Sequence, residues 1–133
     1  MGEVVIITGG SRGIGAATAK LAASRGYDVC LSYYHDESAA KHVVDAIENA
    51  GQRALAIKGD VANEADVIQL FASCRDELGT PVGLVNNAGI VAVQSRVEDM
   101  SAERLQRMFA VNITGSMLCA REAVRCMSTK NGG

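Results

Sequence analysis

Short apolar runs alternate along this chain with longer segments in which apolar residues recur every three or four positions. The runs predict buried strands, because they are continuous and rich in β-branched residues. The longer segments predict helices that bury one face. Strands are expected over Val4–Ile7, Val29–Ser32 and Ala54–Ile57, with a fourth from Leu84–Val85. Helices are expected over Gly13–Arg25, Asp36–Ala50 and Asn63–Leu78, then after Ser101 and near Ile113–Met127.

The order of these elements indicates how they pack. Strands that alternate with helices, with glycines between them, are typical of βαβ units and a parallel sheet. The predicted fold class is therefore α/β, a Rossmann-type doubly wound parallel sheet with strand order 3-2-1-4. In such a sheet the ligand binds where the order reverses, here between the first and fourth strands. With 133 residues, the chain is expected to form one domain, residues 1–133.

Composition and charge indicate which binding partners and which cellular location are expected for this protein. The formal net charge is −2 at pH 7, so the basic surface needed for nucleic acid or an anionic membrane is not expected. The first apolar run is too short for a signal peptide or a membrane span. None of the four cysteines forms a C-x-x-C pair, so no metal site is predicted. Cys30 and Cys74 fall at apolar positions, which fits free thiols in a cytoplasmic protein.

The segment TGGSRGIG, Thr8–Gly15, joins the first predicted strand to the first predicted helix. The first N–H groups of a helix are unpaired and its amino end is electropositive, so a pyrophosphate fits there. On this interpretation Gly9 allows a tight turn, Gly13 lets phosphates approach the backbone, and Gly15 lets the helix sit close to the strand. Glycines that only form a turn are the alternative.

This turn resembles the T-G-x-x-x-G-x-G fingerprint of the short-chain dehydrogenases/reductases. Three further features resemble that family in content and order, namely GDV at Gly59–Val61, NNAG at Asn86–Gly89, and Asn112 in FAVNITG. The resemblance covers essentially the whole chain and corresponds to the N-terminal, cofactor-binding part of a member. It implies an oxidoreductase that transfers a hydride between a nicotinamide cofactor and a small carbonyl or alcohol substrate.

The resemblance implies roles at three of these positions. Asp60 would accept a hydrogen bond from the adenine amino group, and the backbone of Val61 would contact the edge of the ring. The alternative for Asp60 is a loop residue or a helix-entry cap. Asn112 would hold a water in a proton relay and is the catalytic candidate. Its alternative is a helix residue whose side chain is satisfied by a local backbone bond.

The NNAG segment would line the crevice from the fourth strand. The resemblance places Asn86, Ala88 and Gly89 beside the adenosine ribose, whereas Asn87 would hold neighbouring strands together. The complete set of cofactor-binding candidates is Thr8, Gly9, Ser11, Arg12, Gly13, Ile14, Gly15, Tyr33, Asp60, Val61, Asn86, Ala88 and Gly89.

The end of the second strand bears on the choice between NADP and NAD. An acidic residue that binds a ribose 2′-hydroxyl is expected about 20 residues beyond the glycines, and Tyr33 stands there. Asp28 comes too early, and Asp36 is expected to cap a helix. Arg12, inside the glycine turn, is placed to pair with a 2′-phosphate. NADP is therefore the predicted cofactor, with NAD as the alternative.

The proton donor that the resemblance implies is a tyrosine in a Y-x-x-x-K pair. The tyrosines of this chain are Tyr27, Tyr33 and Tyr34, and none is followed by a lysine four residues later. Two hypotheses result. The chain is the N-terminal part of an NADP-dependent oxidoreductase, truncated before the catalytic segment, or it is a catalytically silent dinucleotide-binding module. In this family the helix equivalent to Ile113–Met127 packs against its copy, which implies a homo-oligomer.

Overall fold

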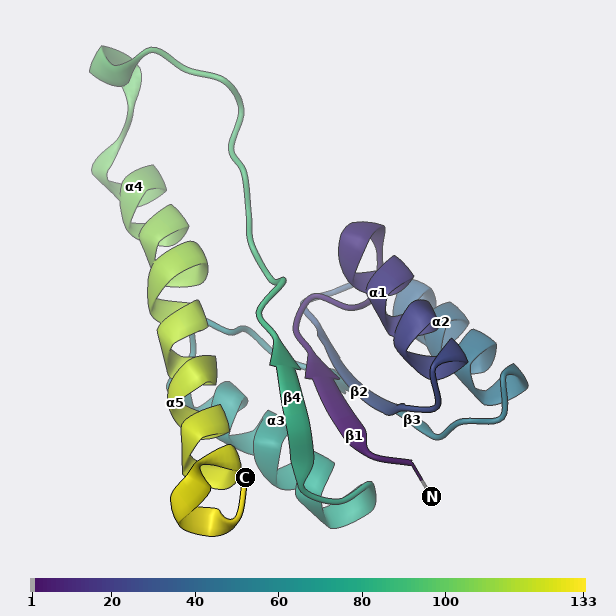
Figure 1. Cartoon of the computed structure of the whole chain (residues 1–133). Coiled ribbons are helices and arrows are strands. Elements are labelled where there is room, and N and C mark those ends of the chain that lie inside the picture. Colours follow the sequence, from purple (N-terminus) through teal and green to yellow (C-terminus); the bar gives the residue numbers. More distant parts are fainter. Residues whose placement is uncertain (1) are drawn as a thin grey trace.

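The computed structural model describes residues 2–133 and contains a four-stranded parallel sheet (Figure 1). The sheet has the order β3-β2-β1-β4, as predicted. Its strands are β1 (Val4–Ile7), β2 (Asp28–Tyr33), β3 (Ala54–Lys58) and β4 (Pro81–Val85). β4 begins earlier than the sequence predicted, because Pro81 occupies the first position of a strand, where a missing N–H is tolerated.

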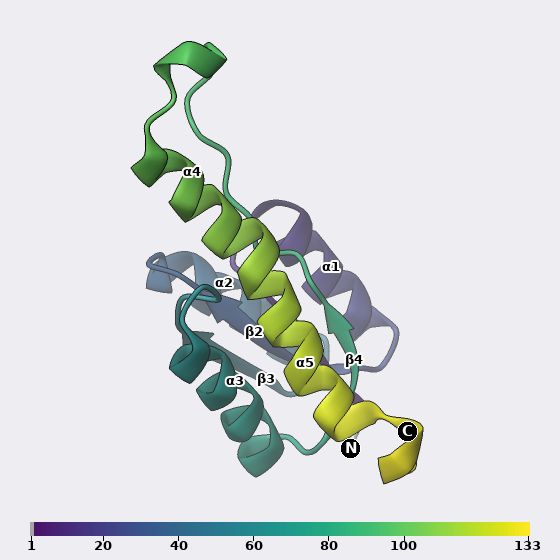
Figure 2. The same cartoon turned by 90° about the vertical axis from the view of Figure 1, so that its left-hand side faces the viewer.

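Helices cover both faces of this sheet (Figures 1 and 2). α1 (Gly13–Ser24) and α2 (Glu37–Asn49) lie on one face, and α3 (Glu64–Glu77) and α5 (Ser116–Met127) lie on the other. Successive strand residues alternate between these layers, so Ile6 and Cys30 pack with α3 and α5 while Ile7 and Leu31 pack with α1 and α2. Both faces are buried, which explains why the strands read as continuous apolar runs.

The last helices form one rod that extends past the end of the sheet (Figure 1). α4 (Ala102–Phe109) begins at Ser101, whose side chain accepts a hydrogen bond from the backbone N of Arg104 (3.1 Å). The π-helical segment Ala110–Gly115 then leads directly into α5. The sequence predicted two helices with little or no break, and the junction is this wider turn. π-Helical turns are frequent at functional sites, and this one contains Asn112.

Asp28 and Arg53 close the amino-terminal edge of the sheet. Asp28 is buried and accepts hydrogen bonds from the backbone N (2.9 Å), Nε (2.9 Å) and Nη2 (2.7 Å) of Arg53. Arg53 Nη2 also donates to the carbonyl of Leu78, after α3. Burial acts to raise the pKa of Asp28, but the hydrogen bonds from Arg53 outweigh it and hold that pKa below its ordinary value.

Two of the sequence predictions concern free thiols and membrane-spanning segments. All four cysteines are free thiols, and Cys30, Cys74 and Cys119 are buried. Within residues 2–133, none of the helices combines the length and the apolarity that crossing a bilayer requires.

Candidate functional site

A cavity of about 420 Å³ opens at the carboxyl ends of the strands, where the strand order reverses. The predicted site residues that line it are Gly9, Ser11, Arg12, Tyr33, Asp60, Val61, Ala88 and Gly89. Its wall also contains residues that the sequence did not nominate for binding: Ser32, Tyr34, His35, Asp36, Gly59, Asn87, Ile90, Arg107 and Val111. The other candidates, Thr8, Gly13, Ile14, Gly15, Asn86 and Asn112, are not part of this wall.

The glycine-rich turn between β1 and α1 forms one side of the cavity. Gly9 and Gly13 have φ of 63° and 58°, a region that favours glycine. A Cβ on Gly15 would lie 2.2 Å from the carbonyl oxygen of Gly9 and 2.5 Å from Nδ2 of Asn87. The close approach at Gly15 is therefore made against the turn and Asn87, not against the strand as the sequence predicted. A Cβ on Gly13 would meet nothing within 4 Å, so this position is open.

The amino end of α1 differs from those of the next helices. Asp36, Asn63 and Ser101 cap α2, α3 and α4, each accepting a hydrogen bond from a backbone N–H in the first turn. Among the described residues, no side chain caps α1, which follows Arg12 and has no acidic residue in its first turn. Its first N–H groups therefore have no side-chain partner, and they follow Ser11 and Arg12 of the cavity wall.

Thr8 and Asn87 join the ends of β1 and β4. The hydroxyl of Thr8 accepts hydrogen bonds from the backbone N of Asn87 (3.1 Å) and of Ala88 (2.9 Å). Asn87 Nδ2 donates to the carbonyl oxygens of Thr8 (3.1 Å) and Gly9 (3.0 Å). Asn87 therefore holds neighbouring strands together, as the resemblance implied, and Thr8 acts from behind the wall by positioning the NNAG segment.

Asp60 forms an ion pair with Arg107 in the cavity wall. Its Oδ1 accepts a hydrogen bond from the backbone N of Ala62 (3.0 Å), and its Oδ2 accepts one from Nη1 of Arg107 (2.9 Å). The guanidinium carbon of Arg107 also lies 5.4 Å from the centroid of the Tyr34 ring. The hydrogen bond to Asp60 raises the pKa of Arg107 above its ordinary value. Sequence reasoning missed Arg107, because an arginine in a polar helix carries no signal of its own.

Asn112 and Asn86 are both bound to main-chain groups. The amide of Asn112 pairs with the backbone N and O of Ile90, at 2.8 and 2.9 Å. Asn86 Nδ2 donates to the carbonyl of Ser116 (2.9 Å). The two side chains thus attach the segment after β4 to the π-helical turn and to α5. The backbone partner of Asn112 is 22 positions away in the chain, so it is not the local bond considered for this residue.

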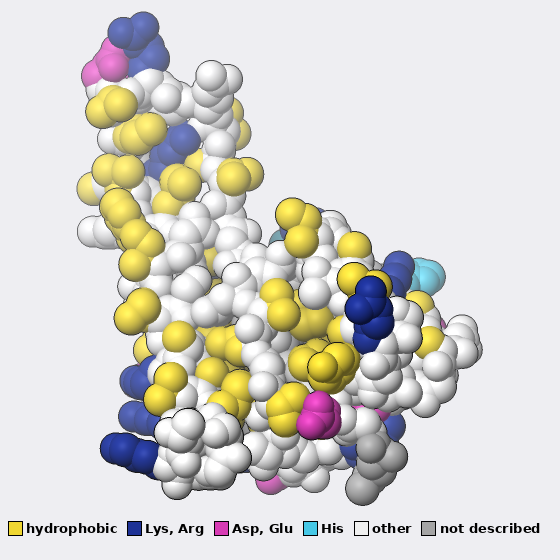
Figure 3. All heavy atoms as spheres, viewed as in Figure 1, with side chains coloured by type: hydrophobic (Ala, Val, Ile, Leu, Met, Phe, Trp, Pro, Cys, Tyr) yellow, Lys and Arg dark blue, Asp and Glu magenta, His cyan; other side chains and the backbone are white. Residues whose placement is uncertain are grey.

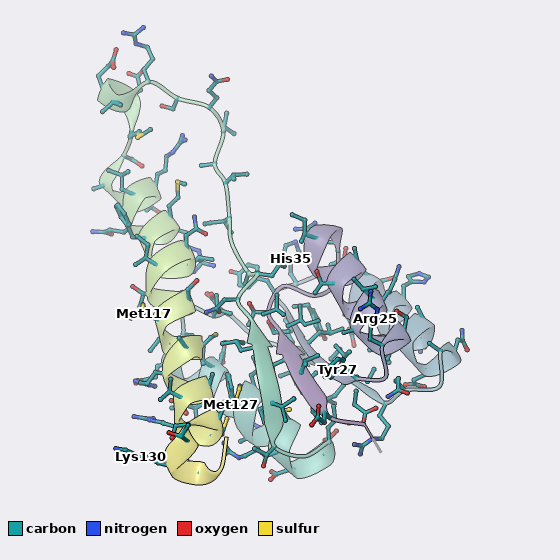
Figure 4. The ribbon with its side chains drawn as sticks, in the orientation of Figure 1. Arg25, Tyr27, His35, Met117, Met127 and Lys130 are labelled. Atoms are coloured by element: carbon teal, nitrogen blue, oxygen red, sulfur yellow. The ribbon has the colours of Figure 1, made fainter. Side chains whose placement is uncertain are left out.

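The end of β2 carries Tyr33 at the position where an acidic residue was considered. Tyr33 lines the cavity together with Arg12 and His35. Figure 4 shows His35 at the end of the sheet where β1 leads into α1. Within residues 2–133, the carboxylates that line the cavity are Asp36 and Asp60, and both accept hydrogen bonds from the protein. Asp28 lies at the opposite end of β2 and binds Arg53.

The sequence of this chain also matches a known protein family. The family model described as short chain dehydrogenase matches residues 3–133. The chain belongs to this family. Its membership accounts for the glycine turn, the GDV and NNAG segments and the parallel sheet together, and it implies a nicotinamide dinucleotide as the cofactor.

Individual known proteins also match nearly the whole chain. The uncharacterized oxidoreductase YgfF of Escherichia coli (strain K12) is 43% identical, over 98% of this chain and 53% of its own length. The L-rhamnose 1-dehydrogenase (NAD(P)(+)) of Sphingomonas sp. (strain SKA58) is 36% identical, over 99% of this chain and 52% of its own length. The solved short-chain dehydrogenase/reductase of Serratia marcescens BCRC 10948 has a TM-score of 0.90 at 38% identity, over 96% of this chain and 51% of its own length. The chain spans about half the length of these relatives.

Proposed function

We propose that this chain forms the NADP-binding part of a short-chain dehydrogenase that acts on a small carbonyl or alcohol substrate. The observation that carries the proposal is the cavity at the reversal of strand order, beside the uncapped amino end of α1. An anion there would complete the first turn of α1 in the way that side chains complete α2, α3 and α4. A pyrophosphate is the anion that joins the two halves of a dinucleotide.

The residues present fit such a cofactor. The turn from Ser11 to Gly15 would hold the pyrophosphate, because Gly13 is open toward an approaching group and α1 presents its free N–H groups. Asp60 and Val61 would hold the adenine, and Ala88 and Gly89 would line the ribose side. When bound, the nicotinamide supplies or accepts the hydride.

NADP is favoured over NAD by two residues of the cavity wall, Arg12 before α1 and Tyr33 at the end of β2. Arg12 lines the cavity, and Tyr33 occupies the position at which a carboxylate would repel a 2′-phosphate. The nearby Asp36 is directed to the backbone N of Ala39 (3.0 Å) as the cap of α2. An arginine paired with a phosphate contributes about 1.5–3 kcal/mol to binding.

Asn112 is proposed to serve the proton-transfer side of the reaction. The π-helical turn and Ile90 fix its amide, yet the carbonyl oxygen retains a second lone pair and the amino group a second proton. These free positions would hold a water. We also propose a cytoplasmic location, which the four free thiols support.

A homo-oligomer is proposed through the outer face of the α4–α5 rod. Phe109, Ile113, Met117 and Val124 on this rod are each more than half exposed, with exposed fractions of 56%, 52%, 68% and 64%. Figure 3 shows apolar side chains along this outer edge. An apolar row of this length on a surface is typical of a protein interface. A second copy would cover it in the way that the family resemblance implies.

The alternative, a silent dinucleotide-binding module, is favoured by one observation. None of Tyr27, Tyr33 and Tyr34 is followed by a lysine four positions later, so these 133 residues hold no Y-x-x-x-K pair. Both proposals expect the same binding, and they differ in turnover. Assays of NADPH oxidation with a panel of ketones, on the full-length natural protein, separate them.

Binding itself is tested at Ile14, which is 79% exposed in the first turn of α1. An Ile14→Asp change places an anion at the amino end of α1, next to the proposed pyrophosphate position, while favouring the helix through its dipole. We expect Ile14→Asp to weaken NADPH binding by at least tenfold, roughly the effect of one charged contact, and Ile14→Asn to weaken it far less. Nicotinamide fluorescence measures both. Equal affinities in the two variants would overturn the proposed site.

A further inference from the structure

Arg107 connects three parts of the molecule that the chain order keeps apart. It comes from the last turn of α4, its Nη1 donates to Asp60 after β3 (2.9 Å), and its guanidinium lies over Tyr34 after β2. All three residues line the cavity. The ion pair is partly exposed, with side-chain exposures of 39% for Arg107 and 24% for Asp60. Exposed pairs contribute little to folding stability, so stability alone does not account for this arrangement.

The carboxylate of Asp60 has two hydrogen-bond donors within the protein. Ala62 binds Oδ1 and Arg107 binds Oδ2, so the carboxylate is held in one orientation with each oxygen used once. The backbone N of Asp60 is fixed as well, by Oδ2 of Asp66 (2.9 Å). A carboxylate oxygen accepts two hydrogen bonds, and therefore each oxygen can accept one more from a group in the cavity.

We propose that Arg107 is a positioning residue for the adenine ring: it fixes the carboxylate of Asp60 so that this carboxylate accepts a hydrogen bond from the exocyclic amino group. The inference rests on the proposed function, because it requires an adenine dinucleotide in the cavity. Arg107 acts through Asp60 and is distinct from Arg12, whose proposed partner is the 2′-phosphate. The ion pair thus governs which base is accepted, and Arg12 governs which ribose is accepted.

The test compares NAD with nicotinamide hypoxanthine dinucleotide, in which a carbonyl replaces the amino group. Titration calorimetry of the purified protein gives the ratio of the two affinities. We expect the unaltered protein to bind NAD about tenfold more tightly, the effect of one hydrogen bond to a charged group. Arg107→Ala should reduce this ratio toward one by weakening NAD binding, and Arg107→Lys should restore part of it. The ratio of NADPH to NADH affinity should stay unchanged in Arg107→Ala.

Two controls separate positioning from a structural role. Gln106→Ala alters the neighbouring exposed residue of the same helix, outside the cavity wall, and should leave the ratio unchanged. In an Asp60→Asn background, Arg107→Ala should have no further effect on the ratio, because both changes remove the same contact. Circular dichroism and thermal unfolding establish that each variant is folded.

The outcomes distinguish this inference from the proposed function. Equal weakening of both dinucleotides by Arg107→Ala, or an unchanged ratio, would overturn the role of Arg107 and leave the dinucleotide site standing. A ratio that falls in Arg107→Ala and recovers in Arg107→Lys supports it. Failure of the unaltered protein to bind either dinucleotide would overturn the proposed function and this inference together.

Discussion

The side-chain amide of Asn112 binds both backbone polar groups of Ile90. Ile90 N donates to Oδ1 over 2.8 Å, and Nδ2 donates to Ile90 O over 2.9 Å. Ile90 lies in the cavity wall, in an irregular segment whose main chain has no ladder partner in the sheet among residues 2–133. A side chain on the π-helical turn therefore substitutes for a strand and holds this part of the wall in place.

An Asn112→Ala change should release this segment. We expect faster hydrogen exchange at the Ile90 amide and weaker cofactor binding, because the wall becomes mobile. Asn112→Asp keeps an acceptor for the Ile90 N–H and should retain most of the protection. Asn86→Ala, which removes a bond to Ser116 instead, is the matched control. Unchanged exchange at Ile90 in Asn112→Ala would contradict the assigned role.

Arg12→Ala should reduce the preference for NADPH over NADH. The loss of one phosphate contact corresponds to about 1.5–3 kcal/mol, or roughly tenfold to a hundredfold in the affinity ratio. Arg25→Ala removes an equal charge beyond the other end of α1 (Figure 4) and should leave the ratio unchanged. Fluorescence titration with both nucleotides measures the ratio, and an Arg12→Ala ratio equal to that of the unaltered protein would count against NADP.

Gly15→Ala and Gly13→Ala separate close packing from backbone conformation. A Cβ at Gly15 meets the Gly9 carbonyl oxygen at 2.2 Å, so the turn has to move and the cost is about 3 kcal/mol. Gly13→Ala places a Cβ on a residue with left-handed backbone conformation, which should lower the free energy of unfolding by about 1 kcal/mol. Urea unfolding of both variants gives these values. Equal destabilisation would show that the contact at Gly15 is relieved without strain.

The buried Asp28 should make stability depend on acid pH. Its folded pKa lies below the unfolded one, so its contribution is present above the unfolded pKa and is lost as pH falls through the folded pKa. Asp28→Asn should therefore lower the free energy of unfolding at neutral pH and flatten its decline between about pH 5 and about pH 3. Arg53→Ala should cost about 1–3 kcal/mol at neutral pH, since the buried carboxylate keeps only its other donors. Arg75→Ala, an exposed change on α3, is the control.

Much of the fold could be predicted because its signals are local. The apolar runs of β1, β2 and β3 and the caps Asn63 and Ser101 each depend on adjacent residues, and all were placed within a residue or two. The start of β4 was missed because Pro81 and Gly83 disfavour strands in general, whereas pairing with β1 decides the matter here.

The candidate site was less predictable, because its polar contacts span long stretches of chain. Arg107 and Asp60 are 47 positions apart, and their meeting depends on where the segment after β4 places α4. Thr8 was nominated for binding by the fingerprint alone, while its hydroxyl is committed to the NNAG segment 79 and 80 positions later. A motif identifies which residues matter, and the partners of a buried hydroxyl can be read only from the fold.

The outer face of the α4–α5 rod should determine self-association. Met117 is 68% exposed on this face, and Met117→Glu places a charge in the centre of the proposed interface, where it would be desolvated. Ala17→Glu adds the same charge at an exposed position of α1, on the other layer. We expect light scattering to show oligomers for the 133-residue chain and for Ala17→Glu, and a shift to monomers for Met117→Glu. A monomeric 133-residue chain at high concentration would rule out this interface.

The same samples should bind NADPH without reducing ketones, because they hold no tyrosine–lysine pair of the Y-x-x-x-K type. Turnover comparable to that of an intact family member would rule out the need for that pair.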